Sequence, residues 1–362
     1  MSLQDYFANP KHLAEKGELP LLSNLIERYH EERPFDGLDV VFGHVLVRNS
    51  LVMLEALVAG GANPIIAHIM PTPADEPVLA ELTRANIPVL TPTEAVQHSD
   101  VYIDVNAALG RQQVPSFAAE VTRTGIHHYQ DIDTTIISAD NSKAKNIEGF
   151  FGTGDGFVRA WKLLRPDDSL EGKRLTQFGY GKIGRGLAFI ARTASAQVSV
   201  VDTDVAKRQR ATEDGFTAVD GTPNPDLQGI LAQTDIVVLV TGIPAFLSEA
   251  LPPDWMRANQ PTLVNLGAED EFGPAYADEE IMGGREIPLN FHNEWPTINK
   301  FIDPPLAAHI MALEAWATNP DAYGPGIHPL PEEMDNWLVN TWRQHWPDED
   351  LTAIAQELGL EE

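Results

Sequence analysis

From Leu38 onward, short apolar runs alternate with segments in which apolar residues recur every three or four positions. Short β-branched runs are typical of strands buried on both faces, and the longer spacing is typical of helices that bury one side. Strands that alternate with helices predict parallel sheets covered by helices, which is an α/β fold. We expect strands at 39–44, 64–70, 87–90, 101–105, 136–137, 216–219, 235–240 and 262–267. We expect helices at 50–59, 75–85, 156–164, 204–215, 226–233, 253–259, 304–317 and 332–344.

The segment 174–202 predicts a strand, a glycine turn, a helix and a second strand that ends in an acid. Gly179 permits the tight turn, and Gly181 lets the backbone approach a pyrophosphate. Gly184 lets the helix pack closely on the sheet, and the helix N-terminus offers N–H groups to the phosphates. Asp202 lies near the roughly 20-residue offset expected of an acid that binds ribose hydroxyls. The segment therefore predicts a Rossmann-type dinucleotide site.

The acidic residues after the second strand favour NAD over NADP. Asp202 and Asp204 would repel a 2′-phosphate. Lys207, Arg208 and Arg210 argue the other way, but they fall within an expected helix. We interpret these three as a solvated helix face, and NAD is the predicted cofactor.

Composition narrows the choice of partners. The 362 residues include 53 acidic and 25 basic side chains, for a formal net charge of −28. This excess disfavours nucleic acids and anionic membranes, which are themselves polyanions. The N-terminus resembles no signal peptide, and polar residues interrupt the apolar stretch 51–70. We expect a cytoplasmic protein with a small-molecule substrate. No metal site is expected, because the chain lacks cysteine and His127, His128 and Asp131 lack ligand spacing.

Several motifs, taken in order over roughly residues 20–340, resemble the S-adenosylhomocysteine hydrolase family. Each match is modest, but their order and spacing are specific. They are Gly43–Val47, Thr122–His127, Asp140–Lys145 with Phe151–Gly152, Gly179–Gly184, Thr241–Gly242, Asn265–Gly267, and Asn319–Tyr323 with Gly326–His328.

The resemblance implies a discontinuous α/β substrate domain, a Rossmann NAD domain and a homo-oligomer, either dimer or tetramer. On this reading residues 1–150 and 296–345 form the substrate domain, 151–295 form the NAD domain, and 346–362 form a C-terminal helical tail. The family uses NAD as a built-in redox catalyst that oxidises a ribose hydroxyl. The expected cofactor-binding residues are Thr122, Thr124, Gly179, Gly181, Lys182, Ile183, Gly184, Asp202, Thr241, Gly242 and Asn265.

The sequence departs from the family pattern where substrate chemistry takes place. The adenine-recognising Thr and Glu of the family correspond to Leu46 and Arg48. A guanidinium cannot accept a hydrogen bond from an amino group, but it suits a carboxylate or phosphate. Two proton-moving histidines correspond to Ala268 and Trp295, and the catalytic lysine corresponds to Ala144.

The remaining polar residues supply the candidates for catalysis. They lie at strand ends, in the matched segments or near the hinge, and each also has an ordinary structural interpretation as a cap, a salt bridge or a solvated side chain. The catalytic candidates are His44, Asp104, Lys143, Lys145, Glu148 and His292; the substrate-binding candidates are Arg48 and Glu120. The sequence leaves open which of Lys143 and Lys145 faces the site.

Three functions remain. The first is an NAD-dependent enzyme with a diverged pocket that transfers a hydride from a small polar or anionic substrate, with Arg48 as the anion contact. The second is adenosylhomocysteine hydrolysis with a rearranged set of acids and bases. The third is an NAD sensor without turnover. We favour the first. The loss of two proton-moving histidines argues against the second, and the polar candidates that remain on both sides of the expected cleft argue against the third.

Overall fold

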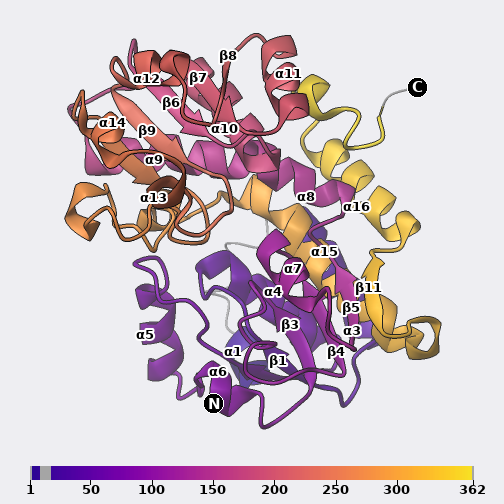
Figure 1. The fold of residues 1–362 in the computed structure, drawn as a ribbon. Coiled ribbons are helices and arrows are strands. Elements are labelled where there is room, and N and C mark those ends of the chain that lie inside the picture. The colour runs from indigo at the N-terminus through magenta and orange to yellow at the C-terminus, as the bar shows by residue number, and fades with distance from the viewer. Residues whose placement is uncertain (1, 9–17, 361–362) are drawn as a thin grey trace. The chain divides into compact units, whose positions relative to one another are not determined.

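The computed structural model describes residues 2–8 and 18–360. The chain divides into two compact units, one made of residues up to Glu148 and from Ile298 onward, the other of Gly149–Thr297. Figure 1 shows the elements of each unit. None of the described helices is long and apolar enough to cross a membrane.

The first unit contains a six-stranded sheet in the order β11-β5-β4-β3-β1-β2, in which every neighbouring pair is parallel. Its strands are β1 Asp39–Phe42, β2 Asn63–Ile66, β3 Val101–Asp104, β4 Phe117–Glu120, β5 Thr135–Ser138 and β11 Gly326–Pro329. Its helices are α1 Leu3–Phe7, α3 Pro20–Glu32, α4 Arg48–Ala59, α5 Glu76–Arg84, α6 Pro92–Ala95, α7 Arg123–Tyr129, α8 Lys143–Ile147, α15 Asn299–Thr318 and α16 Glu332–His345.

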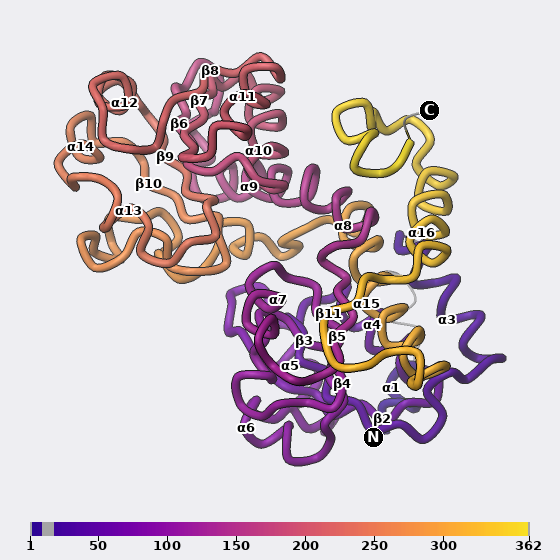
Figure 2. Tube along the Cα trace, turned by 45° about the vertical axis from the view of Figure 1, so that its right-hand side comes forward, coloured from indigo at the N-terminus to yellow at the C-terminus, as the bar shows by residue number. Residues whose placement is uncertain are grey.

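Helix α15 is the central helix of this unit. It packs against strands β3, β4 and β5 and against helices α3, α4, α8 and α16. In both Figure 1 and Figure 2 this late segment lies among strands from the first half of the chain. The helix begins at Asn299, ahead of the predicted start at Pro304. Proline at 304 removes the helical N–H that would bond the Lys300 carbonyl, and the Trp342 indole donates to that carbonyl instead, at 2.7 Å.

The second unit contains a five-stranded parallel sheet in the order β10-β9-β6-β7-β8. The order reverses beside β6, which is where ligands bind in doubly wound sheets. Its strands are β6 Arg174–Phe178, β7 Gln197–Asp202, β8 Thr217–Asp220, β9 Ile236–Leu239 and β10 Thr262–Asn265. Its helices are α9 Thr153–Leu164, α10 Lys182–Thr193, α11 Val205–Glu213, α12 Pro225–Leu231, α13 Phe246–Ala250 and α14 Pro253–Arg257.

The α/β prediction is confirmed, and two details of it need correction. The strand expected at Ile87–Leu90 is wrong, because only one bridge forms there, between Ala67 and Leu90. Strands β4 and β11 were not anticipated. The first contains two alanines and a buried acid, and the second contains glycine and proline, so neither has the β-branched composition typical of strands.

Candidate functional site

The glycine turn of the second unit has the shape that a dinucleotide requires. Gly179 has a φ of +103°, and a Cβ there would collide with the Val240 carbonyl. A Cβ at Gly184 would collide with the Gly179 carbonyl. A Cβ at Gly181 would meet nothing within 4 Å, so there is open space at the start of α10. No described side chain caps that helix, which leaves room for a phosphate at its N-terminus.

Gln177 holds the turn in place, and the sequence reasoning missed it. Its side chain is fully buried, and Nε2 donates to the carbonyls of Gly179 at 2.8 Å and Gly184 at 2.7 Å. These two bonds tie the start of the turn to the first turn of α10. The available signal was an amide side chain in the strand, two positions before the first glycine of the turn.

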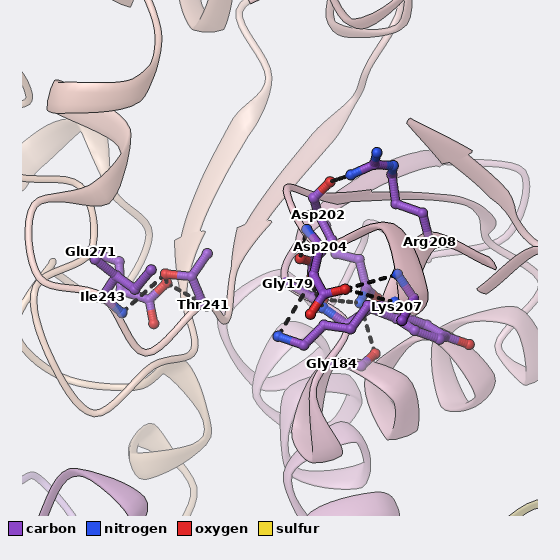
Figure 3. Close-up of polar contacts among 12 residues, drawn as sticks. Gly179, Gly184, Asp202, Asp204, Lys207, Arg208, Thr241, Ile243 and Glu271 are labelled. Carbon is purple, nitrogen blue, oxygen red and sulfur yellow. Dashed lines mark hydrogen bonds and ion pairs between the residues drawn. The ribbon is translucent and has the colours of Figure 1, made fainter. Parts of the chain in front are cut away.

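Asp202 lies beside the turn, as the acid of the predicted site should (Figure 3). Its carboxylate accepts from the backbone N–H of Tyr180 at 2.8 Å and of Asp204 at 2.9 Å. Lys207 Nζ lies 3.8 Å from the same carboxylate, and Arg208 donates to the Asp202 carbonyl at 2.8 Å. Arg208 is therefore bonded to the backbone of the acid, whereas Lys207, whose side chain is 47% exposed, remains on the solvated helix face that we expected.

On the other side of the sheet reversal, Glu271 organises the loop after β9 (Figure 3). Its buried carboxylate accepts from the N–H and hydroxyl of Thr241 and from the N–H of Gly242, each at 2.7 Å. Burial raises the pKa of Glu271. Asn265 donates to the carbonyls of Glu269 at 2.9 Å and Arg285 at 2.7 Å. The three predicted cofactor residues of this region therefore have partners within the protein.

The remaining predicted cofactor residues lie on two helices. Lys182 and Ile183 begin α10, and a Cβ at Gly149 would collide with the Lys182 stem. In the first unit, Thr122 caps α7 by accepting from Gly125 N at 3.1 Å, and Thr124, two residues further on, is half-buried.

A buried ion pair marks the candidate substrate site of the first unit. Lys145 Nζ lies 2.6 Å from Glu148 Oε2, and their side chains are 15% and 10% exposed. Burial alone would lower the pKa of Lys145, but the carboxylates of Glu148 and Asp140 outweigh it and raise the pKa. The amine therefore stays charged. Lys143 instead donates to Asn336 of α16 at 2.8 Å, so Lys145 is the lysine of this cluster.

His44 is a neutral base within electrostatic range of Lys145. It follows β1, where its ring stacks on Phe42 with centroids 5.8 Å apart. Burial lowers its pKa to about 4, and the charge of Lys145 contributes to the same shift. Its Nδ1 lies 3.2 Å from the Val45 carbonyl. A carbonyl only accepts, so Nδ1 carries the proton and Nε2 presents a lone pair.

Asp104 and Glu120 are register partners on β3 and β4, and both are fully buried. Asp104 accepts from the N–H groups of Val105, Leu109 and Gly110, and from the Tyr129 hydroxyl at 2.6 Å. Glu120 accepts from Ala107 N at 2.9 Å and from the N–H and hydroxyl of Thr122. Burial raises the pKa of both carboxyls. These bonds shape the loop after β3 and the start of α7.

Two further candidates have partners outside the Lys145–Glu148 pair. Arg48 begins α4, and its guanidinium lies 3.6 Å from Glu81 with the side chain 33% exposed. His292 belongs to the second unit, where Nε2 lies 2.9 Å from the Gly283 carbonyl.

Comparison with known proteins supports the resemblance. No family model matches the chain. The adenosylhomocysteinase of Thermococcus kodakarensis is 27% identical over 93% of this chain and 92% of that protein. The S-inosyl-L-homocysteine hydrolase of Methanopyrus kandleri is 29% identical over 66% of this chain and 63% of that protein, so this match spans less than two thirds of the relative. A solved dipicolinate synthase chain from Bacillus halodurans has a TM-score of 0.50 at 13% identity, covering 79% of this chain and 100% of that structure.

These findings define the class of the protein. The structural match shows a two-domain α/β fold of the Rossmann type. The chain is a diverged relative of the adenosylhomocysteinases. The open space at Gly181, the placement of Asp202 and these relatives together support NAD as its cofactor.

Proposed function

We propose that the protein is an NAD-dependent enzyme that oxidises a hydroxyl group of a small polar or anionic substrate. The observation that carries the proposal is the buried Lys145–Glu148 pair together with neutral His44, whose pKa is lowered further by the charge of Lys145. Removal of a hydroxyl proton requires a base, and a nearby cation stabilises the negative charge that develops on the oxygen. Bound NAD would accept the hydride.

Each residue has a separate role in that oxidation. His44 Nε2 accepts the hydroxyl proton, and the Lys145 ammonium donates a hydrogen bond that stabilises the oxygen as the carbonyl forms. Glu148 keeps Lys145 charged and oriented. Arg48 offers a planar pair of donors to an anionic group of the substrate.

The NAD-loaded protein tests this proposal when it is mixed with hydroxy acids and nucleosides and NADH absorbance is followed. We expect Lys145→Met to lower the rate about 10²–10³-fold, the range for loss of one donor to a developing oxygen anion. Lys143→Met should cost far less, because Lys143 contacts α16. The double variant K145M/E148Q leaves no unpaired buried charge and controls for folding. Equal rates for K145M and the unmodified protein would refute the assignment.

A second candidate function, hydrolysis of a nucleoside thioether of homocysteine, is favoured by the names of the relatives. In it, hydroxyl oxidation is internal to the cycle, and free thiol appears without net NADH. Arg48 can donate to the 6-oxo oxygen of hypoxanthine but cannot accept from the amino group of adenine. We therefore expect S-inosylhomocysteine to be cleaved faster than S-adenosylhomocysteine, and Arg48→Glu to reverse the preference. NADH without thiol excludes hydrolysis, and bound NAD that reacts with neither class identifies a sensor.

A further inference from the structure

His309 lies next to His44, although no motif in the sequence points to it. It belongs to α15, its side chain is fully buried, and its ring centroid is 5.8 Å from that of His44 with the planes tilted by 52°. Both residues belong to the first unit. Two histidines of the family pattern are absent from this chain, and the fold places a different histidine, His309, next to His44.

The hydrogen bond of His309 determines which of its ring nitrogens is protonated and which is an unprotonated acceptor. Nε2 lies 2.8 Å from the Ala119 carbonyl of β4, so Nε2 carries the proton. Nδ1 is buried and has no partner among the described residues. The neighbouring His44 likewise presents a bare Nε2, because its Nδ1 faces the Val45 carbonyl. Two acceptor nitrogens of adjacent rings are therefore available to donors.

A purely structural role does not explain a bare nitrogen in this position. A buried polar atom without a partner costs about 1–3 kcal/mol, and the bond to the Ala119 carbonyl uses only Nε2, so it does not account for the unpartnered Nδ1. Burial, with His44 and Lys145 adding to it, lowers the pKa of His309 to about 3, so the ring is a neutral acceptor. The arrangement of two neutral acceptors near an ammonium suits a ligand that supplies O–H donors.

We propose that His309 is a second ligand-binding histidine of this site, whose Nδ1 accepts a hydrogen bond from an O–H group held beside His44. The O–H belongs to a hydroxyl of the substrate, or to a water molecule that takes its place. The inference rests on the proposed function and deepens it, because it adds a residue that orients the hydroxyl-bearing part of the substrate. No bond is made or broken at His309.

Three variants test the role of Nδ1. His309→Gln keeps an N–H for the Ala119 carbonyl but removes the basic nitrogen, and His309→Phe keeps the ring shape without either nitrogen. His328→Gln is the matched control, because His328 also bonds a carbonyl through Nε2, at 2.7 Å to Gly324, and lies outside the cluster. Circular dichroism of each full-length, NAD-loaded variant checks the fold.

The probes are adenosine, inosine and their 2′-deoxy and 3′-deoxy analogues, with affinity measured by calorimetry. We expect H309Q and H309F to bind the nucleosides about tenfold or more weakly, as loss of one buried hydrogen bond implies, and H328Q to bind normally. If the loss vanishes for one deoxy analogue, the donor is that hydroxyl. An equal loss for every analogue assigns the donor to the 5′-hydroxyl, which all the probes retain, or to water. Affinities within twofold of the unmodified protein for both H309Q and H309F overturn the proposal.

Nitrogen NMR separates failure of this inference from failure of the proposed function. The ¹⁵N resonance of His309 Nδ1, assigned by its absence in H309Q, should show an unprotonated and hydrogen-bonded nitrogen even without ligand. A protonated Nδ1, or one without a donor in both free and nucleoside-treated protein, overturns the role of His309. Absence of NADH and of thiol with every substrate overturns the proposed function instead, whatever the resonance shows.

Discussion

At the scale of single residues, Asp202 links three parts of the cofactor site. Its carboxylate accepts from Tyr180 in the glycine turn and from Asp204 at the start of α11, and Lys207 lies 3.8 Å away. Ribose hydroxyls are donors, so they suit this carboxylate, whereas a 2′-phosphate would be repelled by it. Lys207 is 47% exposed and could serve a phosphate if the acid were absent.

Asp202→Ser should therefore change the choice of cofactor. We expect NAD affinity to fall about tenfold and the ratio of NADP to NAD affinity to rise, because the serine no longer repels a 2′-phosphate and Lys207 is released. Calorimetry with both cofactors measures the ratio. Asp220→Ser is the control, since Asp220 pairs with Arg208 at 2.8 Å and its side chain is 40% exposed. An unchanged ratio in D202S would contradict the role given to Lys207.

Asp303 gives the stability of the first unit a pH dependence. Its buried carboxyl accepts from the N–H groups of Leu21 at 2.7 Å and Leu22 at 3.0 Å, at the start of α3. Burial raises its pKa from an ordinary value of 3.8 to about 7. The unfolded chain therefore releases this proton from pH about 4 upward while the folded chain retains it to about 7, so stability falls as pH rises across that window.

Asp303→Asn removes that titration. Between pH about 4 and pH about 7, the free energy of unfolding of the unmodified protein should fall by about 2–4 kcal/mol relative to that of D303N. Urea denaturation at a series of pH values measures it. Asp350→Asn, at a fully exposed position, controls for the change in net charge. Parallel stability curves for D303N and the unmodified protein would show that Asp303 does not titrate in this range.

At the scale of elements, the β6–α10 turn depends on Gln177. In Gln177→Leu the carbonyls of Gly179 and Gly184 lose their donor, so we expect about tenfold weaker NAD binding and a loss of about 1–3 kcal/mol in stability. Thr176→Val is the control on the same strand, because Thr176 bonds Thr234 at 2.7 Å. It should cost stability and leave NAD affinity unchanged. Equal NAD affinities in Q177L and T176V would show that Gln177 does not support the turn.

The sequence predicted elements with strong local signals and missed those that depend on tertiary contacts. Glycine spacing and the final acid made β6, α10 and β7 recognisable. Strand β4 was missed because its alanines and buried Glu120 lack a strand pattern. The start of α15 was misplaced because Trp342, from another helix, takes the carbonyl that Pro304 frees.

In the candidate site, too, the sequence predicts residues that carry a local signal and misses those that depend on tertiary contacts. The matched segment predicted Lys143, Lys145 and Glu148 as candidates. The structure pairs Lys145 with Glu148, whereas the partner of Lys143 comes from α16, which the sequence could not show. His309 could not be found from sequence, since its neighbour His44 lies on a distant part of the chain and only the packing of α15 brings them together.

At the scale of the whole molecule, the charge balance is the dominant electrostatic property. With 53 acidic and 25 basic residues, one-to-one pairing would neutralise fewer than half of the acids. The folded state concentrates this negative charge, and the resulting repulsion favours the expanded chain. Exposed ion pairs oppose the effect only weakly, since each contributes about 0–1 kcal/mol.

Added NaCl should therefore stabilise the protein. We expect the free energy of unfolding to rise steeply between about 0.01 and 0.15 M salt, where the screening length falls from about 30 to 8 Å, and to change less above that. Urea denaturation is the suitable measurement, because guanidinium chloride is itself a salt. At mildly acidic pH, where some carboxylates are neutral, the salt effect should shrink; an increase common to both pH values would point to salting-out. A fall in stability with NaCl at neutral pH would mean that the surface ion pairs, such as Arg174–Asp235 and Arg257–Glu280, outweigh the repulsion.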